Sequence, residues 1–174
     1  MRRVVFATVG CALIAATTGP VHAQQASTAC RLLQVAELEA AIGGKASGPP
    51  TGSKTAVPGM TLDDCSVGLS GAQLHSVSVR IITNLGMDGA QAIVIQNTGT
   101  AREQQWQTAG ARLEQATVGK AICILTGRPH VSSHTICRIP RGEGYLEVDV
   151  AGSVDELPSN ATVAALVQKV FTRL

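Results

Sequence analysis

Aromatic residues are scarce in this sequence. The 174 residues include one tryptophan, one tyrosine and two phenylalanines, and one of these, Phe6, lies in the expected leader described below. Surfaces that stack sugars or nucleic-acid bases need several aromatic rings, so the scarcity argues against both kinds of site. The hydrophobic core must instead be filled by Val, Ile, Leu and Ala.

A surplus of positive charge is also missing from the part of the chain that we expect to remain after processing. Lys and Arg number 14 against 12 Asp and Glu, and Arg2 and Arg3 belong to the expected leader. Removing these two leaves 12 against 12, which is formally neutral. Without a basic surplus, we expect no long-range attraction to nucleic acid or anionic lipid.

Residues 1–23 have the pattern of a cleavable signal peptide. Two arginines precede an uncharged apolar run over 4–16. The segment 21–23, which ends at Ala23, supplies small residues at the positions that a signal peptidase reads, so cleavage is expected after Ala23. The run is shorter than the roughly 20 residues that a membrane-spanning helix needs, so we expect cleavage rather than an anchor. The sequence therefore predicts one periplasmic or secreted domain over 24–174, with no membrane span after cleavage.

The spacing of apolar residues divides this domain into helices, strands and a loop. Val35, Leu38 and Ile42 repeat at helical spacing, whereas Val77, Val79 and Ile81 alternate with polar residues as in a strand with one buried face. The expected elements are a first helix ending at Gly43, an exposed loop over 45–60, strands over 65–69 and 76–81, a helix over 88–108 interrupted near Gly99, strands over 121–126, 135–139 and 145–150, and a helix after Pro158. This order predicts an α+β fold, with an antiparallel sheet of about five strands and helices packed on one face.

Cysteine occurs in an even number once the leader is removed. Cys11 lies in the leader, and the other four cysteines reach an oxidising compartment, where two disulfides are expected. Cys123 and Cys137 lie on two expected hairpin strands, where an ordinary register places them opposite each other. We therefore predict Cys123–Cys137 and Cys30–Cys65, although four cysteines allow two other pairings.

Two histidines form a local concentration of possible metal ligands. His130 and His134 lie between Cys123 and Cys137, and imidazole is a common ligand of soft metals. Oxidised cysteines do not serve as thiolate ligands, and the segment lacks the glutamate of a helical zinc-protease motif. We assign no metal or cofactor, and keep a His-based metal-binding module as an alternative.

Two carboxylates are the strongest candidates for acid/base chemistry. Glu147 and Asp149 share one strand face with Tyr145 and lie about 7 Å apart along the strand, within the range of a glycosidase pair. A solvated sheet face explains the same alternation. His75 begins an apolar strand face, where we expect a satisfied edge residue rather than a base. No catalytic residue is assigned, and a protein without enzyme activity is favoured.

The segment Cys30-Arg31-Leu32-Leu33-Gln34-Val35-Ala36-Glu37-Leu38 resembles the opening of a family of secreted bacterial domains of unknown function. Members begin with a cysteine, two leucines and a Thr-x-Ala-Glu-Val helix ending in Gly. Gln34 and Leu38 depart from that pattern, while Cys65 matches a second cysteine that precedes a strand. The resemblance implies a small exported α+β domain, likened to extracellular sensor or ligand-binding modules, and it supplies no catalytic residues.

These observations predict an exported, non-catalytic module that binds a small ligand, an envelope component or another protein. The binding surface is expected on the open sheet face, in a concave patch near Arg80, Arg138 and Tyr145. An envelope enzyme built on His75 with Glu147 or Asp149 is the second hypothesis. The identity of the partner and the oligomeric state stay open.

Overall fold

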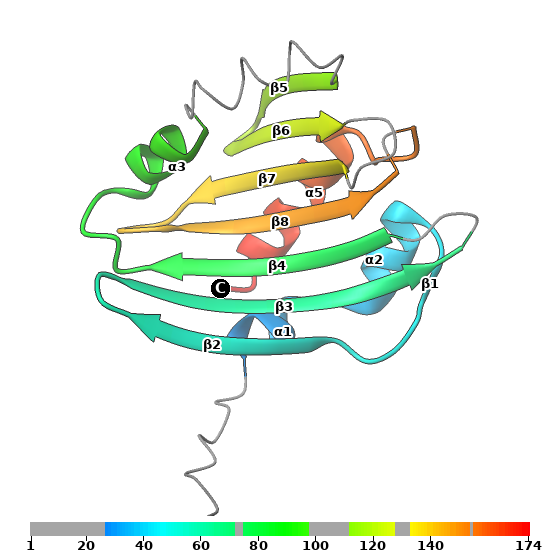
Figure 1. The fold of residues 1–174 in the computed structure, drawn as a ribbon, viewed down its shortest axis with the longest axis horizontal. Coiled ribbons are helices and arrows are strands. Elements are labelled where there is room, and N and C mark those ends of the chain that lie inside the picture. Colours follow the sequence, from blue (N-terminus) through cyan, green and yellow to red (C-terminus); the bar gives the residue numbers. More distant parts are fainter. Residues whose placement is uncertain (1–26, 72–74, 98–111, 128–132, 154) are drawn as a thin grey trace, which may run out of the picture.

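The computed structural model describes residues 27–71, 75–97, 112–127, 133–153 and 155–174, so the expected leader lies outside the described residues. These residues form one antiparallel sheet of eight strands with four helices (Figure 1). The helices are α1 (Thr28–Leu32), α2 (Val35–Ile42), α3 (Gly89–Asn97) and α5 (Asn160–Phe171). The strands are β1 (Lys45–Ala46), β2 (Thr51–Val57), β3 (Met60–Ser70), β4 (His75–Thr83), β5 (Arg112–Val118), β6 (Ala121–Gly127), β7 (Ser133–Pro140) and β8 (Tyr145–Gly152).

The sheet joins two meanders through a contact between distant parts of the chain. Its strand order is β1-β3-β4-β8-β7-β6-β5, and β2 pairs with β3 on the same side as β1. The two meanders meet where β4 pairs with β8, with Ser76 opposite Ala151 and Ile82 opposite Tyr145. Residues that are far apart in the sequence therefore lie side by side in the middle of the sheet.

The expected α+β fold with about five strands is wrong. The described residues are mostly sheet, with 48% strand and 26% helix, and they form eight strands. Residues 45–60, expected as an exposed loop, contain β1 and β2, and β5 at Arg112–Val118 was not expected at all. The side chains of β2 are mostly exposed because it lies at the sheet edge, so the apolar alternation that marks a half-buried strand is missing there.

A two-residue turn explains why the polar β2 segment nevertheless pairs. Val57 and Met60 are opposite each other, and Pro58 and Gly59 connect them. Proline presets the first central position of such a turn, and Gly59 takes the positive φ of 80° that the second requires.

One face of the sheet is covered by α1, α2 and α5, which lie behind the sheet in Figure 1. Alternate residues of the central strands point to this face and pack against an apolar stripe of α5. The fully buried members of this core include Leu69, Val77, Val79, Leu146, Val148, Val150, Val163 and Val167.

Among the described residues, α3 is the helix that packs on the opposite face, at one end, and we call this face the open face. Ala92 and Ile93 of α3 contact Ile82 and Tyr145, which point away from the covered face. The expectation that all helices pack on one face is therefore wrong. The carboxylate of Asp88 accepts a hydrogen bond from the backbone N–H of Gln91 at 2.7 Å and caps the start of α3. Residues 98–108 of the helix expected over 88–108 lie outside the described residues.

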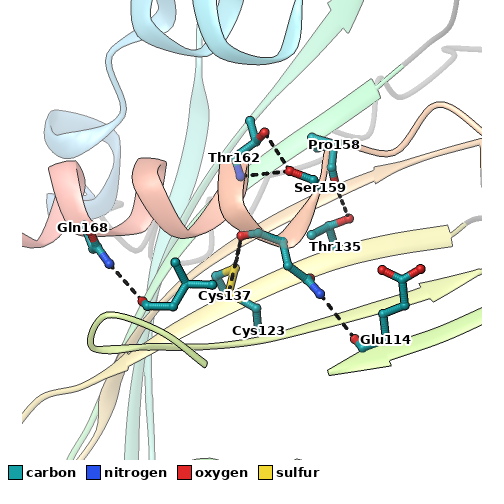
Figure 2. Close-up of a disulfide and its surroundings, with 10 residues drawn as sticks. Glu114, Cys123, Thr135, Cys137, Pro158, Ser159, Thr162 and Gln168 are labelled. Atoms are coloured by element: carbon teal, nitrogen blue, oxygen red, sulfur yellow. Dashed lines mark hydrogen bonds between the residues drawn. A yellow bond between two sulfur atoms is a disulfide. The ribbon is translucent and has the colours of Figure 1, made fainter. Parts of the chain in front are cut away.

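Both predicted disulfides are present. Cys123 lies opposite Cys137 in the β6–β7 register, with a Cα–Cα distance of 4.1 Å. Figure 2 shows this disulfide beneath the first turn of α5, where Thr135 donates to the carbonyl oxygen of Pro158 at 2.8 Å. Cys30–Cys65 ties α1 to β3, with a Cα–Cα distance of 4.9 Å. The first cross-link thus joins the strands β6 and β7 under α5, and the second anchors α1 to the covered face.

The residues that follow α5 lie against α1 and α2. Arg173 donates to the carbonyl oxygen of Leu32 at 3.1 Å and pairs with the carboxylate of Glu37. The hydrogen bond from Arg173 lowers the pKa of Glu37. Within the described residues, the helices are all too short or too polar to cross a bilayer.

Candidate functional site

The open face carries a row of charged side chains that we call the charged row. Antiparallel register places one residue from each of four neighbouring strands in line, and successive residues alternate in sign. The members of the charged row are Asp64 on β3, Arg80 on β4, Glu147 on β8 and Arg138 on β7. A carboxylate and a guanidinium on adjacent strands are close enough to interact directly.

Glu147 is the centre of the charged row. Arg80 Nη1 lies 2.5 Å from one carboxylate oxygen of Glu147, and Arg138 Nε lies 2.6 Å from the other. Glu147 is 2% exposed, while the side chains of Arg80 and Arg138 are 35% and 13% exposed. A carboxylate this deeply buried is stabilised by charge-assisted hydrogen bonds to both of its oxygens. The two arginines are therefore held in fixed positions on the open face.

Tyr145 supports this arrangement from below. The guanidinium carbon of Arg138 lies 5.5 Å from the centre of the Tyr145 ring, within the range of a cation–π contact. Tyr145 is 1% exposed and packs with Ile82 and α3. The structure thus places Arg80, Arg138 and Tyr145 on one face of neighbouring strands, where Tyr145 positions Arg138 and does not itself reach the surface. The concave binding patch expected near them stays a prediction.

Asp149 pairs with a histidine on the neighbouring strand. His134 Nδ1 lies 3.0 and 3.2 Å from the two carboxylate oxygens of Asp149. The hydrogen bond to Asp149 raises the pKa of His134, partial burial opposes this, and the charges of Asp149 and Glu147 add to the increase. Glu147 and Asp149 do share one face, as the alternation predicted, but Glu147 is bonded to two arginines and Asp149 to His134.

His75 does not join these carboxylates. It lies on the covered face, in line with Val77, and it is 8% exposed beside Gly152. Its Nδ1 has no hydrogen-bond partner, so the expectation of a satisfied edge residue is wrong. The combination of His75 with Glu147 or Asp149 that the enzyme hypothesis required is not formed, because the sheet separates them.

Of the two histidines predicted as candidate metal ligands, one lies within the described residues. His130 lies outside the described residues, and His134 uses Nδ1 for Asp149. In the part of the chain that the structure describes, no three His, Cys, Asp or Glu side chains are grouped as a metal site, and the four cysteines there are in disulfides.

A buried carboxylate on the covered face was not identified from the sequence. Asp63 is 4% exposed and accepts hydrogen bonds from Ser27 Oγ at 2.6 Å and from the backbone N–H groups of Thr28 and Ala29. Burial opposes ionisation, but the bonds from Ser27, Ala29 and Thr28 outweigh it and lower the pKa of Asp63. Asp63 thus holds the start of α1 on β3 and has a structural role. The signal in the sequence was Ser27 as a cap residue.

A small hollow lies between β5 and β6, away from the charged row. Its volume is about 170 Å³, below the range of about 300–1,000 Å³ that is usual for small-molecule sites. Its lining residues are Gln115, Ala116, Thr117, Ile122, Cys123 and Ile124. The charged row is therefore the stronger candidate.

Comparison with known proteins yields no match to a family model, a curated protein or a solved structure. The resemblance to secreted domains of unknown function stays a prediction. Any function must be inferred from the open face itself.

Proposed function

We propose that this protein is an exported, non-catalytic binding module whose open sheet face engages an envelope protein or a small ligand. The observation that supports this proposal is the charged row, which lies on a face that α1, α2 and α5 leave uncovered. Two disulfides suit the oxidising periplasmic or extracellular compartment that this function requires.

The charged row has the rigidity that binding surfaces need. Because Glu147 holds both arginines, Arg80 presents a guanidinium whose orientation is already set, which lowers the entropy lost on binding. Arg80 uses Nη1 for Glu147, and its Nη2 has no hydrogen bond among the described residues. That nitrogen remains available to a carboxylate, phosphate or carbonyl oxygen of a partner.

The same contacts argue against catalysis by these groups. Both oxygens of Glu147 accept hydrogen bonds from arginines, which leaves neither oxygen free to take a proton from a substrate. Asp149 is engaged by His134 in the same way. Binding is therefore favoured over an envelope enzyme.

Site-specific photo-cross-linking in an export-competent host tests this proposal. A photoreactive residue at Ser76 or Ser78 samples the open face, whereas Ala161 and Lys169, both exposed on α5, serve as matched controls on the other side. We expect adducts of defined mass from the two serine positions that disappear in Arg80→Gln. Adducts that persist in Arg80→Gln, or that form equally from α5, would contradict the proposal.

A further inference from the structure

His134 lies on the open face of β7, four residues before Arg138 of the charged row. It is opposite Ala151 on β8 and Thr126 on β6, and Ser76 on β4 is opposite Ala151 from the other side. Two strand spacings separate the backbones of Ser76 and His134 by about 9.5 Å. Ala151 is the residue of β8 between them, and its side chain is a single methyl group.

Asp149 determines which nitrogen of His134 changes its protonation. Nδ1 faces both carboxylate oxygens, so it keeps its hydrogen as a donor in the neutral ring and in the charged ring alike. The hydrogen that is gained and lost is therefore on Nε2. The side chain is 33% exposed, and Nε2 has no hydrogen bond among the described residues.

The charged groups around this ring are largely paired with one another. Asp149 and Glu147 face it from β8, Arg138 lies on the same face of β7, and Arg80 lies beyond on β4. Both arginines donate hydrogen bonds to Glu147. Asp149 is therefore the charged group that interacts directly with the ring of His134. Thr126 on β6 and the serines of β4 add hydroxyl groups without charge.

We propose that His134 is a proton-dependent anion contact of the open face, which binds an oxyanion between Nε2 and the hydroxyl group of Ser76, above Ala151. This inference rests on the proposed function of the same face. At a pH below the pKa of His134, the ring carries a positive charge and Nε2 donates a hydrogen bond, which favours a carboxylate, phosphate or sulfate group. At a pH above that pKa, Nε2 has lost its hydrogen, and its lone pair repels the oxygen atoms of the same group.

The hydrogen bond to Asp149 raises the pKa of His134 above the ordinary value for histidine. The ring therefore keeps its positive charge, and the anion contact that depends on it, up to a higher pH than a free imidazole would.

Sulfate is a suitable probe because its charge stays constant over this range. We would follow His134 and the backbone amides by NMR while adding sodium sulfate, with sodium chloride at equal ionic strength as the control, at about pH 5 and about pH 9. We expect sulfate to raise the pH at the midpoint of the His134 titration. We also expect sulfate to bind about tenfold more weakly at the higher pH. His75, whose ring lies on the covered face, provides an internal reference.

Three variants complete the test. His134→Gln keeps a polar side chain without the titration, Ala151→Leu fills the space between Ser76 and His134, and Ser66→Ala changes a hydroxyl on β3, away from the contact. The first two should abolish the pH-dependent sulfate response, and the third should retain it. An equal response at both pH values, a response reproduced by chloride, or a response that survives His134→Gln would overturn the inference.

The cross-linking experiment separates this inference from the proposed function. If adducts from Ser78 persist while sulfate has no pH-dependent effect, the anion contact is wrong and the binding face stands. If both are absent, the proposed function is contradicted as well.

Discussion

The two faces of the sheet are made by the same strands and differ in almost every property. In β8, Leu146, Val148 and Val150 enter the apolar core, whereas Glu147 and Asp149 point to the open face. The covered face is cross-linked by both disulfides and packed against three helices. The open face is held together by hydrogen-bonded charges.

This contrast separates the parts of the chain that stabilise the fold from those available for recognition. Burial of apolar surface contributes roughly 25 cal/mol for each Å², so the covered face supplies most of the stability. Buried ion pairs gain little over apolar residues of similar size, because removing charges from water is costly. The hydrogen bonds from two arginines to Glu147 are therefore not expected to be a main source of stability.

The largest expected effect comes from the cross-links of the covered face. Removing Cys30–Cys65 by a double alanine substitution should lower the free energy of unfolding by about 4 kcal/mol, and removing Cys123–Cys137 by about 3 kcal/mol, because the first closes the longer loop. Equilibrium unfolding in urea measures both. A larger loss from the shorter loop would show that packing under α5, and not loop length, sets the contribution.

A pair of apolar truncations compares the two faces directly. Leu146→Ala, in the covered core, should cost about 3 kcal/mol, because a fully buried side chain leaves a cavity. Ile136→Ala, half-buried on the open face, should cost about 1 kcal/mol, because solvent reaches the vacated space. Urea unfolding of both variants gives the comparison. Equal losses would mean that the open face is packed as tightly as the covered one.

The smallest expected effect distinguishes two buried carboxylates. Asp63→Asn should cost about 2 kcal/mol at neutral pH, because two backbone N–H groups and Ser27 lose an ionised acceptor. Glu147→Gln on the open face should cost about 1 kcal/mol, since Arg80 reaches water. Because the folded state lowers the pKa of Asp63, its contribution is present above the unfolded value of about 3.9 and is lost as pH falls through the folded value.

Urea unfolding at neutral pH and at successively lower pH tests this linkage. The difference in the free energy of unfolding between wild type and Asp63→Asn should disappear at acidic pH. A gap that stays constant down to about pH 2 would show that Asp63 acts through packing and not through its charge.

The strands of the central sheet could be predicted from the sequence, because half-buried strands alternate in polarity. β4 and β8 have this alternation, and the period of two in β8 also placed Glu147 and Asp149 on one face. β6 and β7 were identified instead as short segments rich in apolar residues, bounded by turn residues. The opposed positions of Cys123 and Cys137 followed from one hairpin register. The polar edge strand β2 has no such pattern, since neither side of it is buried.

The partners of these carboxylates could not be predicted in the same way. Arg80 and Glu147 are 67 residues apart and meet because β4 pairs with β8, a long-range contact that no local pattern specifies. His134 and Asp149 are on adjacent strands but interact diagonally, which depends on the register of β7 and β8. Local periodicity indicates which face a residue occupies, while the pairing of distant strands decides its neighbours.

The contact of Arg173 with Leu32 and Glu37 has a practical consequence for how this domain is displayed. It fixes the C-terminal end on the side of α1, α2 and α5, opposite the charged row. A tether at this end, whether to a sensor chip or to a fusion partner, should leave the charged row directed outward. Immobilisation through the C-terminus is thus the natural orientation for screening partners.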